Sequence, residues 1–551
     1  MSQLIQKSPA LMAEKLKELI EIGVALSSEK ELTKLMQMFL DKCLEVCQAE
    51  GASIYLIDKK MIYHDAKNNP LLVPQKIPVL KFLRTMNRSQ GPKDQNTLVE
   101  INKKSIAGFS AFSKRIVNIE DCYKIDSESP YRFNPQNDID TNYKTKSLLT
   151  IPMISAHGQV RGVVQVVNKL GADGIKKIKD GVVPQEHIIS FDKDDEELMK
   201  VFASQAAVAI ENAQLTESIE NLFESFVHAS VKAIEARDPT TSGHSDRVAI
   251  LTVELALSIH KTQVGSFRNV HFSEEQVREL RYAALLHDFG KIGIKEDVLL
   301  KQKKLHSREL ESILLRLDGL ESKSEASQWR QFIETLLEKV EKDPSVDSKW
   351  IHQKVHDIQH HIETTKLRVR QMKSGVIQTN EPYVIKDQKA LDRMLNMINS
   401  TSGHFDHKVL TDNEIKILSI PKGSLSGEER SQIESHVSHT YDFLKQIAWT
   451  DGLEQVAHIA HCHHEKMDGS GYPRGIAGTE IPIQARMMTI ADIYDALVAF
   501  DRPYKKSLTP DTAIDILLSE ANEGKLDIEL LRIFIEAGVY MHINNLVKKT
   551  A

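Results

Sequence analysis

The sequence predicts a multidomain protein in which an α+β domain precedes an all-α domain that carries a helical insertion. Residues 1–193 combine amphipathic helical patterns with alternating, strand-like runs. Residues 236–551 repeat apolar residues at helical spacing, and a charged, helix-prone block at 311–410 interrupts them. The chain has 551 residues, of which 41% are hydrophobic, so it has room for about two to four compact units.

The first region alternates between two periodicities. Amphipathic helical patterns come first, and strand-like runs with the period of two follow them. The helices are expected over 10–26 and 30–49, and the runs are ASIYLID at 52–58, KMIYHDA at 60–66, SLLTIPMIS at 147–155 and VRGVVQVVNK at 160–169. The last two runs are expected to pair around the turn AHGQ. This pattern predicts an antiparallel sheet with helices on one side.

Residues 194–235 contain no Pro or Gly and repeat apolar residues three and four positions apart, which predicts one long helix. We expect this helix to connect the two domains, and to pair with its counterpart in a homodimer as a signalling element. The alternative is a helix that packs within the first domain.

The block at 311–410 predicts an antiparallel helical hairpin, with a glycine-containing break at LDGLES before two long helical patterns. His352, His356 and His360 share one helix face. Because no carboxylate or cysteine accompanies them at matching spacing, a solvated or interfacial stripe is favoured over a metal site. The hairpin could cap the active site, contact the first domain or dimerise, and the sequence leaves these three roles open.

Two motifs in the helical region carry metal-binding chemistry. Residues 463–473 read HHEKMDGSGYP, and AALLHDFGK at 283–291 ends an apolar helical run in His287, Asp288 and Lys291. Neutral imidazole suits iron, manganese, zinc or nickel better than magnesium, and a carboxylate has two oxygens with which to bridge two metals. Single candidates on other amphipathic helices are His244, His436 and Asp492. Together these residues predict a metal-dependent active site.

These motifs resemble the HD-GYP family, the phosphodiesterases of the HD superfamily that hydrolyse cyclic dinucleotides, over residues 225–310 and 415–520. The resemblance implies a bridging role for Asp288 and catalytic roles for Asp288 and Lys291. The metal ligands that it implies are His244, His287, Asp288, His436, His463, His464 and Asp492, and their split between the ions stays open. The substrate-binding residues that it implies are Lys291, Asp468, Gly469, Gly471, Tyr472, Pro473, Arg502 and Lys505.

The resemblance also implies the number of cations. Some members hold a third metal through a Glu four residues before the first ligand histidine, where this chain has Thr240, a poor ligand. We therefore expect two divalent metal ions, with iron or manganese favoured. Such cations would lower the pKa of a bridging water and polarise the phosphoryl oxygens. Gly469 and Gly471 would let the backbone approach a bulky ligand or adopt positive φ, or simply make a turn.

The first region resembles a GAF domain over about 180 residues, and within that family the cyclic-nucleotide-binding GAF domains. The likeness rests on the segment from NIEDCYKIDSESPY to LLTIPM and on five residues that fit the NK-F-DE signature: Asn168, Lys169, Phe191, Asp195 and Glu196. The resemblance implies an ion pair between Lys169 and Asp195. Candidate purine contacts are Ser53, Phe109, Ser110, Ala111, Phe133 and Asn134. A GAF domain that only dimerises or transmits strain is the open alternative.

The expected organisation is a GAF sensor domain with N-terminal helices at 1–193, a connecting helix at 194–235, an HD-GYP domain in two parts at 236–310 and 411–551, and the insertion at 311–410. The expected function is hydrolysis of cyclic di-GMP to the linear dinucleotide pGpG or to GMP, regulated by the GAF domain, for which a cyclic nucleotide is the candidate ligand. The alternatives are the same chemistry on cyclic GMP-AMP or another nucleotide, and a non-catalytic nucleotide receptor.

Composition limits the partners. The net charge of −6 has both signs interspersed, which excludes a basic field for nucleic acid or membrane. The sequence contains no apolar stretch of about 18 residues and no secretory pattern at MSQLIQKSPA. Four cysteines make no disulfide framework. We therefore expect a cytoplasmic protein.

Overall fold

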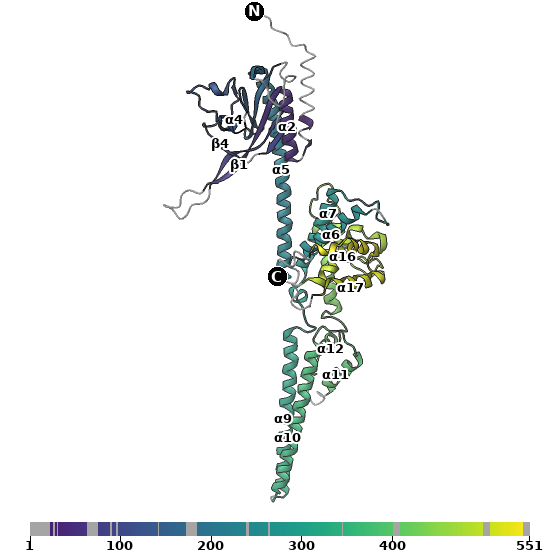
Figure 1. Cartoon of the computed structure of the whole chain (residues 1–551). Helices are drawn as coiled ribbons and strands as arrows, with labels where there is room; N and C mark the ends of the chain where they lie inside the picture. The colour runs from purple at the N-terminus through teal and green to yellow at the C-terminus, as the bar shows by residue number, and fades with distance from the viewer. Residues whose placement is uncertain are drawn as a thin grey trace, which may run out of the picture. The chain divides into compact units, whose positions relative to one another are not determined.

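The computed structural model describes most of the chain, in two compact units, 1–224 and 225–551 (Figure 1). Each unit is considered by itself. The described residues are 23–25, 28–29, 31–62, 75–88, 91–94, 97–141, 143–171, 185–238, 242–262, 265–343, 345–400, 408–499 and 507–543. Most of the helix expected at 10–26, together with Thr240, Arg502 and Lys505, lies outside them. Among the described residues, none of the helices combines the length and apolar character needed to cross a bilayer.

The first unit is built on an eight-stranded sheet with the central order β3-β2-β1-β7-β6-β5, in which β4 pairs with β2 and β8 with β7. All the pairs are antiparallel. The strands are β1 Ala49–Ile62, β2 Gln75–Asn87, β3 Gly91–Asp94, β4 Leu98–Glu100, β5 Val117–Ile119, β6 Leu148–Ile154, β7 Val160–Leu170 and β8 Ile188–Ile189. The predicted pairing around AHGQ is confirmed, because β6 pairs with β7. The runs at 52–58 and 60–66 were expected to be separate, but β1 passes from one into the other while paired with β2.

Helices cover both faces of this sheet, so the prediction of helices on one side is wrong. The helices α2 Leu32–Val46 and α5 Lys193–Arg237 share a core with Val164 and Val166 of β7. On the opposite face, α3 Ile106–Ser113 packs Ala107 and Ala111 against Val163. Neighbouring residues of one strand point to opposite faces, and β7 is apolar on both. A strand of this kind requires cover on both sides. The short elements η1 Cys122–Lys124, α4 Gln136–Thr141 and η3 Gln185–His187 complete the unit.

The residues of the NK-F-DE signature connect β7 to the start of α5 through side-chain contacts. Lys169 forms an ion pair with Asp195, as the resemblance implies, and a second one with Asp192 at 3.1 Å. The side chain of Asn168 is buried, and its amide donates to Glu50 and to the backbone carbonyl of Lys144. Among the further signature residues, Phe191 is buried in the core and Glu196 accepts from Asn118.

The residues suggested for purine contact are engaged within the protein. The hydroxyl of Ser53 donates to Thr85, and that of Ser110 donates to the carbonyl of Arg115. Phe109 packs on Tyr131 and Phe133 on Tyr123, with ring centroids 5.2 and 5.3 Å apart. A ligand at these positions would have to displace these contacts.

The second unit is helical. Its elements outside the insertion are α6 His244–Lys261, α7 Glu274–Leu286, η5 Phe289–Gly293, α8 Glu296–Leu299, α12 Asp412–Leu418, α13 Gly427–Glu434, α14 His436–Leu444, α15 Val456–His461, η6 Gly478–Glu480, α16 Ile483–Val498, α17 Pro510–Asn522, α18 Ile528–Glu536 and η7 Val539–Met541. The last turns of α5 contribute Val227, Val231 and Ile234 to its buried residues. Helices α7 and α16 both pack against α6 (Figure 1) and position part of the candidate site.

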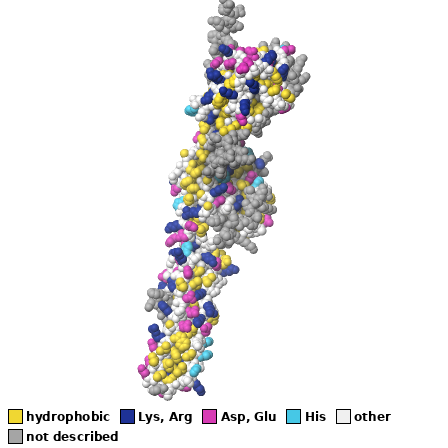
Figure 2. All heavy atoms as spheres, turned by 90° about the vertical axis from the view of Figure 1, so that its left-hand side faces the viewer, with side chains coloured by type: hydrophobic (Ala, Val, Ile, Leu, Met, Phe, Trp, Pro, Cys, Tyr) yellow, Lys and Arg dark blue, Asp and Glu magenta, His cyan; other side chains and the backbone are white. Residues whose placement is uncertain are grey.

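The region expected to be an insertion contains two long helices, α9 Ser307–Lys342 and α10 Ser348–Thr379, and a shorter one, α11 Gln388–Ser400. The expected break at LDGLES is wrong. Helix α9 continues through Gly319 because Leu317 and Leu320 on either side of it are buried, which outweighs the cost of about 1 kcal/mol for a helical glycine. Beyond the part packed on α11, Ile333 and Leu337 are exposed, and Figure 2 shows hydrophobic side chains gathered at this end of the hairpin.

The three histidines of the hairpin, His352, His356 and His360, are exposed along α10. Within the part of the chain that the structure describes, the groups of side chains able to hold a cation contain none of them. Their exposure agrees with a solvated stripe.

Candidate metal centre

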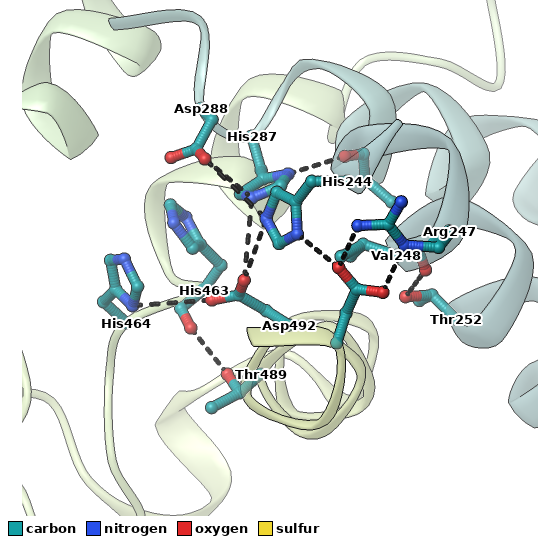
Figure 3. A network of polar contacts seen from close by, with 12 residues as sticks. His244, Arg247, Val248, Thr252, His287, Asp288, His463, His464, Thr489 and Asp492 are labelled. Atoms are coloured by element: carbon teal, nitrogen blue, oxygen red, sulfur yellow. Dashed lines mark hydrogen bonds and ion pairs between the residues drawn. The ribbon is translucent and has the colours of Figure 1, made fainter. Parts of the chain in front are cut away.

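The structure brings all seven predicted ligands together, each at a position where a helix starts or ends or on the inner face of α16. Figure 3 labels these residues except His436. His244 is the first residue of α6, and His436 is the first residue of α14. The other ligand positions are the end of α7 for His287 and Asp288, the turn after α15 for His463 and His464, and the middle of α16 for Asp492. Predicted ligands as far as 248 residues apart in the sequence, His244 and Asp492, meet because the helices pack together.

Backbone carbonyls fix the tautomers of three histidines. The Nδ1 atoms of His287, His436 and His463 lie 2.7, 2.6 and 2.6 Å from the carbonyl oxygens three residues before them. A carbonyl only accepts, so Nδ1 carries the proton and Nε2 offers its lone pair. These three Nε2 atoms are buried and have no hydrogen-bond partner. Buried lone pairs without partners are costly unless something binds them, and a cation fits.

The ligand atoms form two groups on either side of Asp288. One group contains His244, His287 and Asp492, and the other contains His436, His463 and His464; the atoms within each group lie within 4.8 Å of one another. Asp288 forms a third, overlapping group with one histidine of each, His287 and His463. The Oδ2 atom of Asp288 lies 3.4 Å from Nε2 of His287, and its Oδ1 atom lies 3.3 Å from Nε2 of His436. Each oxygen of the carboxylate therefore faces a different group.

The protonation states suit ligands. Burial opposes the charge of Asp288, but Lys291 and His287 hold the pKa of its carboxyl well below the ordinary value. Burial, followed by the neighbouring imidazoles, keeps the pKa of His463 low, and burial lowers the pKa of His464 to about 4. Asp288 is thus ionised and His463 and His464 are neutral, which are the forms that bind metals.

Lys291 brings positive charge to the same place. Its Nζ atom lies 2.7 Å from Oδ2 of Asp288 and 3.5 Å from Oδ2 of Asp238. Burial alone would lower the pKa of Lys291, but these two carboxylates outweigh burial and raise it. The ammonium is therefore charged beside the cluster, where it can meet an anionic substrate.

The loop at 468–473 folds back on the histidine pair. Tyr472 packs on His464 with ring centroids 4.8 Å apart. Gly469 has φ of +79°, and a Cβ atom on Gly471 would lie 2.4 Å from the backbone nitrogen of Lys466. The two glycines thus serve a positive φ and a close backbone approach, respectively. The Tyr472–Pro473 peptide bond is cis. Asp468 accepts from the backbone and hydroxyl of Ser470, which shapes the loop.

Glu465 anchors the end of this loop and was missed by the sequence analysis. It is buried, and its Oε1 atom accepts from the backbone nitrogen of Arg474 at 2.7 Å. Its position inside HHEKMDGSGYP, next to two ligand histidines, was the available signal.

A carboxylate behind His244 was also missed. The Nδ1 atom of His244 lies 2.8 Å from Oδ2 of Asp495, which Arg247 holds through its Nε atom at 2.6 Å. Burial lowers the pKa of His244, but Asp492 and Asp495 outweigh it and raise that pKa to about 9. The signal was helical spacing, because Asp495 is one turn from Asp492 and Arg247 one turn from His244. Such a carboxylate orients a ligand histidine and increases its basicity.

We expect Asp495→Asn to weaken metal binding about 10- to 100-fold, because a neutral amide does not increase the basicity of the His244 imidazole as the carboxylate does. Asp527→Asn is the matched control, since Asp527 is also buried and paired with an arginine, Arg486, at 2.8 Å. Titration of both proteins with Mn(II), followed by calorimetry, measures the effect. Equal affinities in the two variants would refute the role assigned to Asp495.

Comparison with known families agrees with this architecture. A model of the GAF domain matches residues 31–210, and two models of the HD domain match residues 241–393 and 413–530. The chain therefore contains a GAF domain followed by HD-domain sequence, and its second unit has a cluster of His and Asp that could hold metal ions.

Similar proteins include phosphodiesterases of two kinds. The 3'3'-cGAMP-specific phosphodiesterase 3 of Vibrio cholerae is 39% identical over 95 residues, 17% of this chain and 20% of that protein. The cyclic di-GMP phosphodiesterase response regulator RpfG of Xanthomonas campestris is 38% identical over 104 residues, 19% and 26% of the two chains. A probable cyclic di-GMP phosphodiesterase of Vibrio cholerae is 52% identical over 71 residues, 13% and 16%. The chain thus matches between 16% and 26% of the length of these relatives.

Proposed function

We propose that this protein is a metal-dependent cyclic dinucleotide phosphodiesterase of the HD-GYP type that acts on cyclic di-GMP. The observation that carries the proposal is the position of Asp288 between two groups of ligand atoms, with the ammonium of Lys291 at 2.7 Å. The relatives named above act on cyclic dinucleotides, which supports the substrate class.

The residues divide the work as follows. His244, His287 and Asp492 would hold one divalent cation, His436, His463 and His464 would hold the other, and Asp288 would contribute to both. Iron or manganese is the favoured metal, given five imidazole ligands. When bound, the cations supply a hydroxide nucleophile near neutral pH and offset the phosphate charge. Lys291 adds a fixed positive charge where the transition state gains negative charge.

Cyclic GMP-AMP is the second candidate substrate, because one of the relatives is specific for it. Protein purified without oxygen and loaded with Fe(II) or Mn(II) is to be assayed with both dinucleotides, and the products separated. We expect cyclic di-GMP to be hydrolysed to pGpG or GMP with the higher kcat/KM. A metal-loaded protein that binds these nucleotides without turnover would instead be a receptor.

The GAF domain is proposed as the regulatory part, with a cyclic nucleotide as candidate ligand. The ion pair between Lys169 and Asp195 supports a ligand-binding type of GAF domain. Cyclic GMP or cyclic AMP added to the same assay should change kcat or KM. An unchanged rate with both nucleotides would favour a GAF domain that serves only in assembly.

A homodimer through α5 is proposed on the pattern of its exposed side chains. Val201, Val208, Leu215 and Leu222 are seven residues apart and exposed, and Ile219 lies four residues after Leu215. Leu222 is 72% exposed. Apolar residues at this spacing form the seam of a parallel coiled coil. A second copy of α5 would bury them.

We expect Leu215→Asp combined with Leu222→Asp to convert a dimer into a monomer, because charges in a coiled-coil seam lose their hydration on pairing. Ser218→Asp adds one such charge at another exposed position of α5 and should leave the dimer intact. Sedimentation velocity at micromolar concentration measures the mass. A wild-type monomer would contradict the proposal.

A further inference from the structure

The last turn of α5 is hydrogen-bonded to the segment that carries Lys291. The guanidinium of Arg237 donates to the carbonyl oxygens of Ile292 and Ile294, both at 2.7 Å. These carbonyls belong to η5 and to the residue that follows it. Because the guanidinium is a rigid fork with several donors, one side chain fixes both carbonyls at once. The backbone just after Lys291 is therefore attached to the end of α5.

The next residue of the chain holds the lysine itself. Asp238 has a side chain only 8% exposed, and its Oδ2 atom lies 3.5 Å from Nζ of Lys291. The same Nζ lies 2.7 Å from Asp288. The ammonium is thus placed between a carboxylate of the proposed metal centre and a carboxylate from the end of α5. Without Asp238, Asp288 would be the carboxylate nearest to Lys291, and nothing would balance its pull from the side of α5.

The opposite side of η5 has no room to adjust. The backbone nitrogen of Gly290 donates to the hydroxyl of Thr440 at 2.8 Å, and this hydroxyl donates to the carbonyl of His287. A Cβ atom on Gly290 would lie 1.9 Å from the carbonyl oxygen of His436. Helix α14 therefore fixes one side of η5. On the opposite side, the contacts from the end of α5 fix the position of the Lys291 side chain.

We propose that Arg237 and Asp238 are positioning residues for Lys291, so that the end of α5 sets the reactivity of the site. Arg237 fixes the backbone of η5, and Asp238 fixes the ammonium. Helix α5 is continuous from Lys193, beside the NK-F-DE signature, to Arg237. A change in its final turn would alter the position of the Lys291 side chain. The inference rests on the proposed phosphodiester hydrolysis and names the element that regulates it.

A double-mutant cycle tests the proposal. Asp238→Asn and Arg237→Lys are compared with wild type, with Lys291→Met and with the combinations, in the full-length, metal-loaded protein. We expect Asp238→Asn to lower kcat about 100-fold, because the Lys291 ammonium would be misplaced, with little change in KM or metal content. In the Lys291→Met background the same change should cost less than about twofold, because its target is gone.

The control for a general loss of packing is Glu429→Gln. Glu429 accepts from Lys301 at 2.6 and 2.8 Å, another carboxylate and lysine pair of the same unit. Its effect should be the same with or without Lys291. A second readout does not depend on turnover: in metal-free protein, Arg237→Lys should speed hydrogen exchange of the Ile294 amide, which donates to the carbonyl of Lys291, at least about tenfold.

The outcomes separate the two proposals. Wild-type protein that is inactive on cyclic di-GMP, cyclic GMP-AMP and bis(p-nitrophenyl) phosphate rejects the proposed function, and this inference with it. Active wild type with additive effects of Asp238→Asn and Lys291→Met, or with metal lost in proportion to kcat, overturns the positioning role alone.

Discussion

Asp288→Ala is expected to reduce turnover to the level of a protein-free control. The two oxygens of this carboxylate face both sets of ligand atoms, at 3.4 Å from His287 and 3.3 Å from His436. Its loss removes a ligand from both proposed cations and the closest counter-charge of Lys291. Cyclic di-GMP hydrolysis and metal content, measured on the same protein sample, should therefore fall together.

Asp442→Ala provides the matched control for this variant. Asp442 lies on the surface of α14, where its contacts are with Lys445 and the turn around it. We expect its kcat, metal content and thermal unfolding to equal those of wild type. Substantial turnover by Asp288→Ala would exclude a bridging role for this carboxylate, and a similar loss in Asp442→Ala would point to a general sensitivity of the assay.

Gly290→Ala is expected to disrupt the site through backbone contact alone. The added Cβ atom would lie 1.9 Å from the carbonyl oxygen of His436 and 2.5 Å from the backbone nitrogen of Thr440. Neither atom belongs to a side chain that can rotate away, so η5 and α14 must separate. Overpacking of this kind costs about 1–3 kcal/mol, and we expect the upper end of that range. His436 would then move away from Asp288, and metal binding would fall as well.

Gly319→Ala is the matched control for Gly290→Ala. At Gly319 an added Cβ atom meets no other atom within 4 Å, and the residue lies inside α9. This change should raise stability by up to about 1 kcal/mol, because alanine is the better helix former. Urea unfolding of the three proteins measures both effects. An unfolding midpoint of Gly290→Ala equal to that of wild type would refute the close contact between η5 and α14.

The fold class and the components of the site could be predicted from the sequence because both follow local patterns. Helical and strand periodicity place α2, α5, β6 and β7, since each element needs an apolar face of matching period. Adjacent residues such as His463 and His464 carry their chemistry in the sequence itself. The apolar run that ends in His287 and Asp288 also places these two residues at the end of one helix.

Other features could not be predicted, because they depend on what packs against them. The sheet has helices on both faces since β7 is apolar on both, and the sequence does not say which segment covers the second face. Gly319 looks like a helix break until Leu317 and Leu320 are seen to be buried around it. Local preference is weak compared with burial, so tertiary contacts overrule it.

The sequence by itself determined that this chain has an α+β part, a helical part and the residues for a metal centre, because those conclusions need only periodicity and residue chemistry. Only the tertiary structure decided which side chains meet. It set Asp495 behind His244, turned the three Nε2 atoms inward by hydrogen bonds at Nδ1, and joined Arg237 to η5. These contacts link residues far apart along the chain, and their geometry arises only when the helices pack.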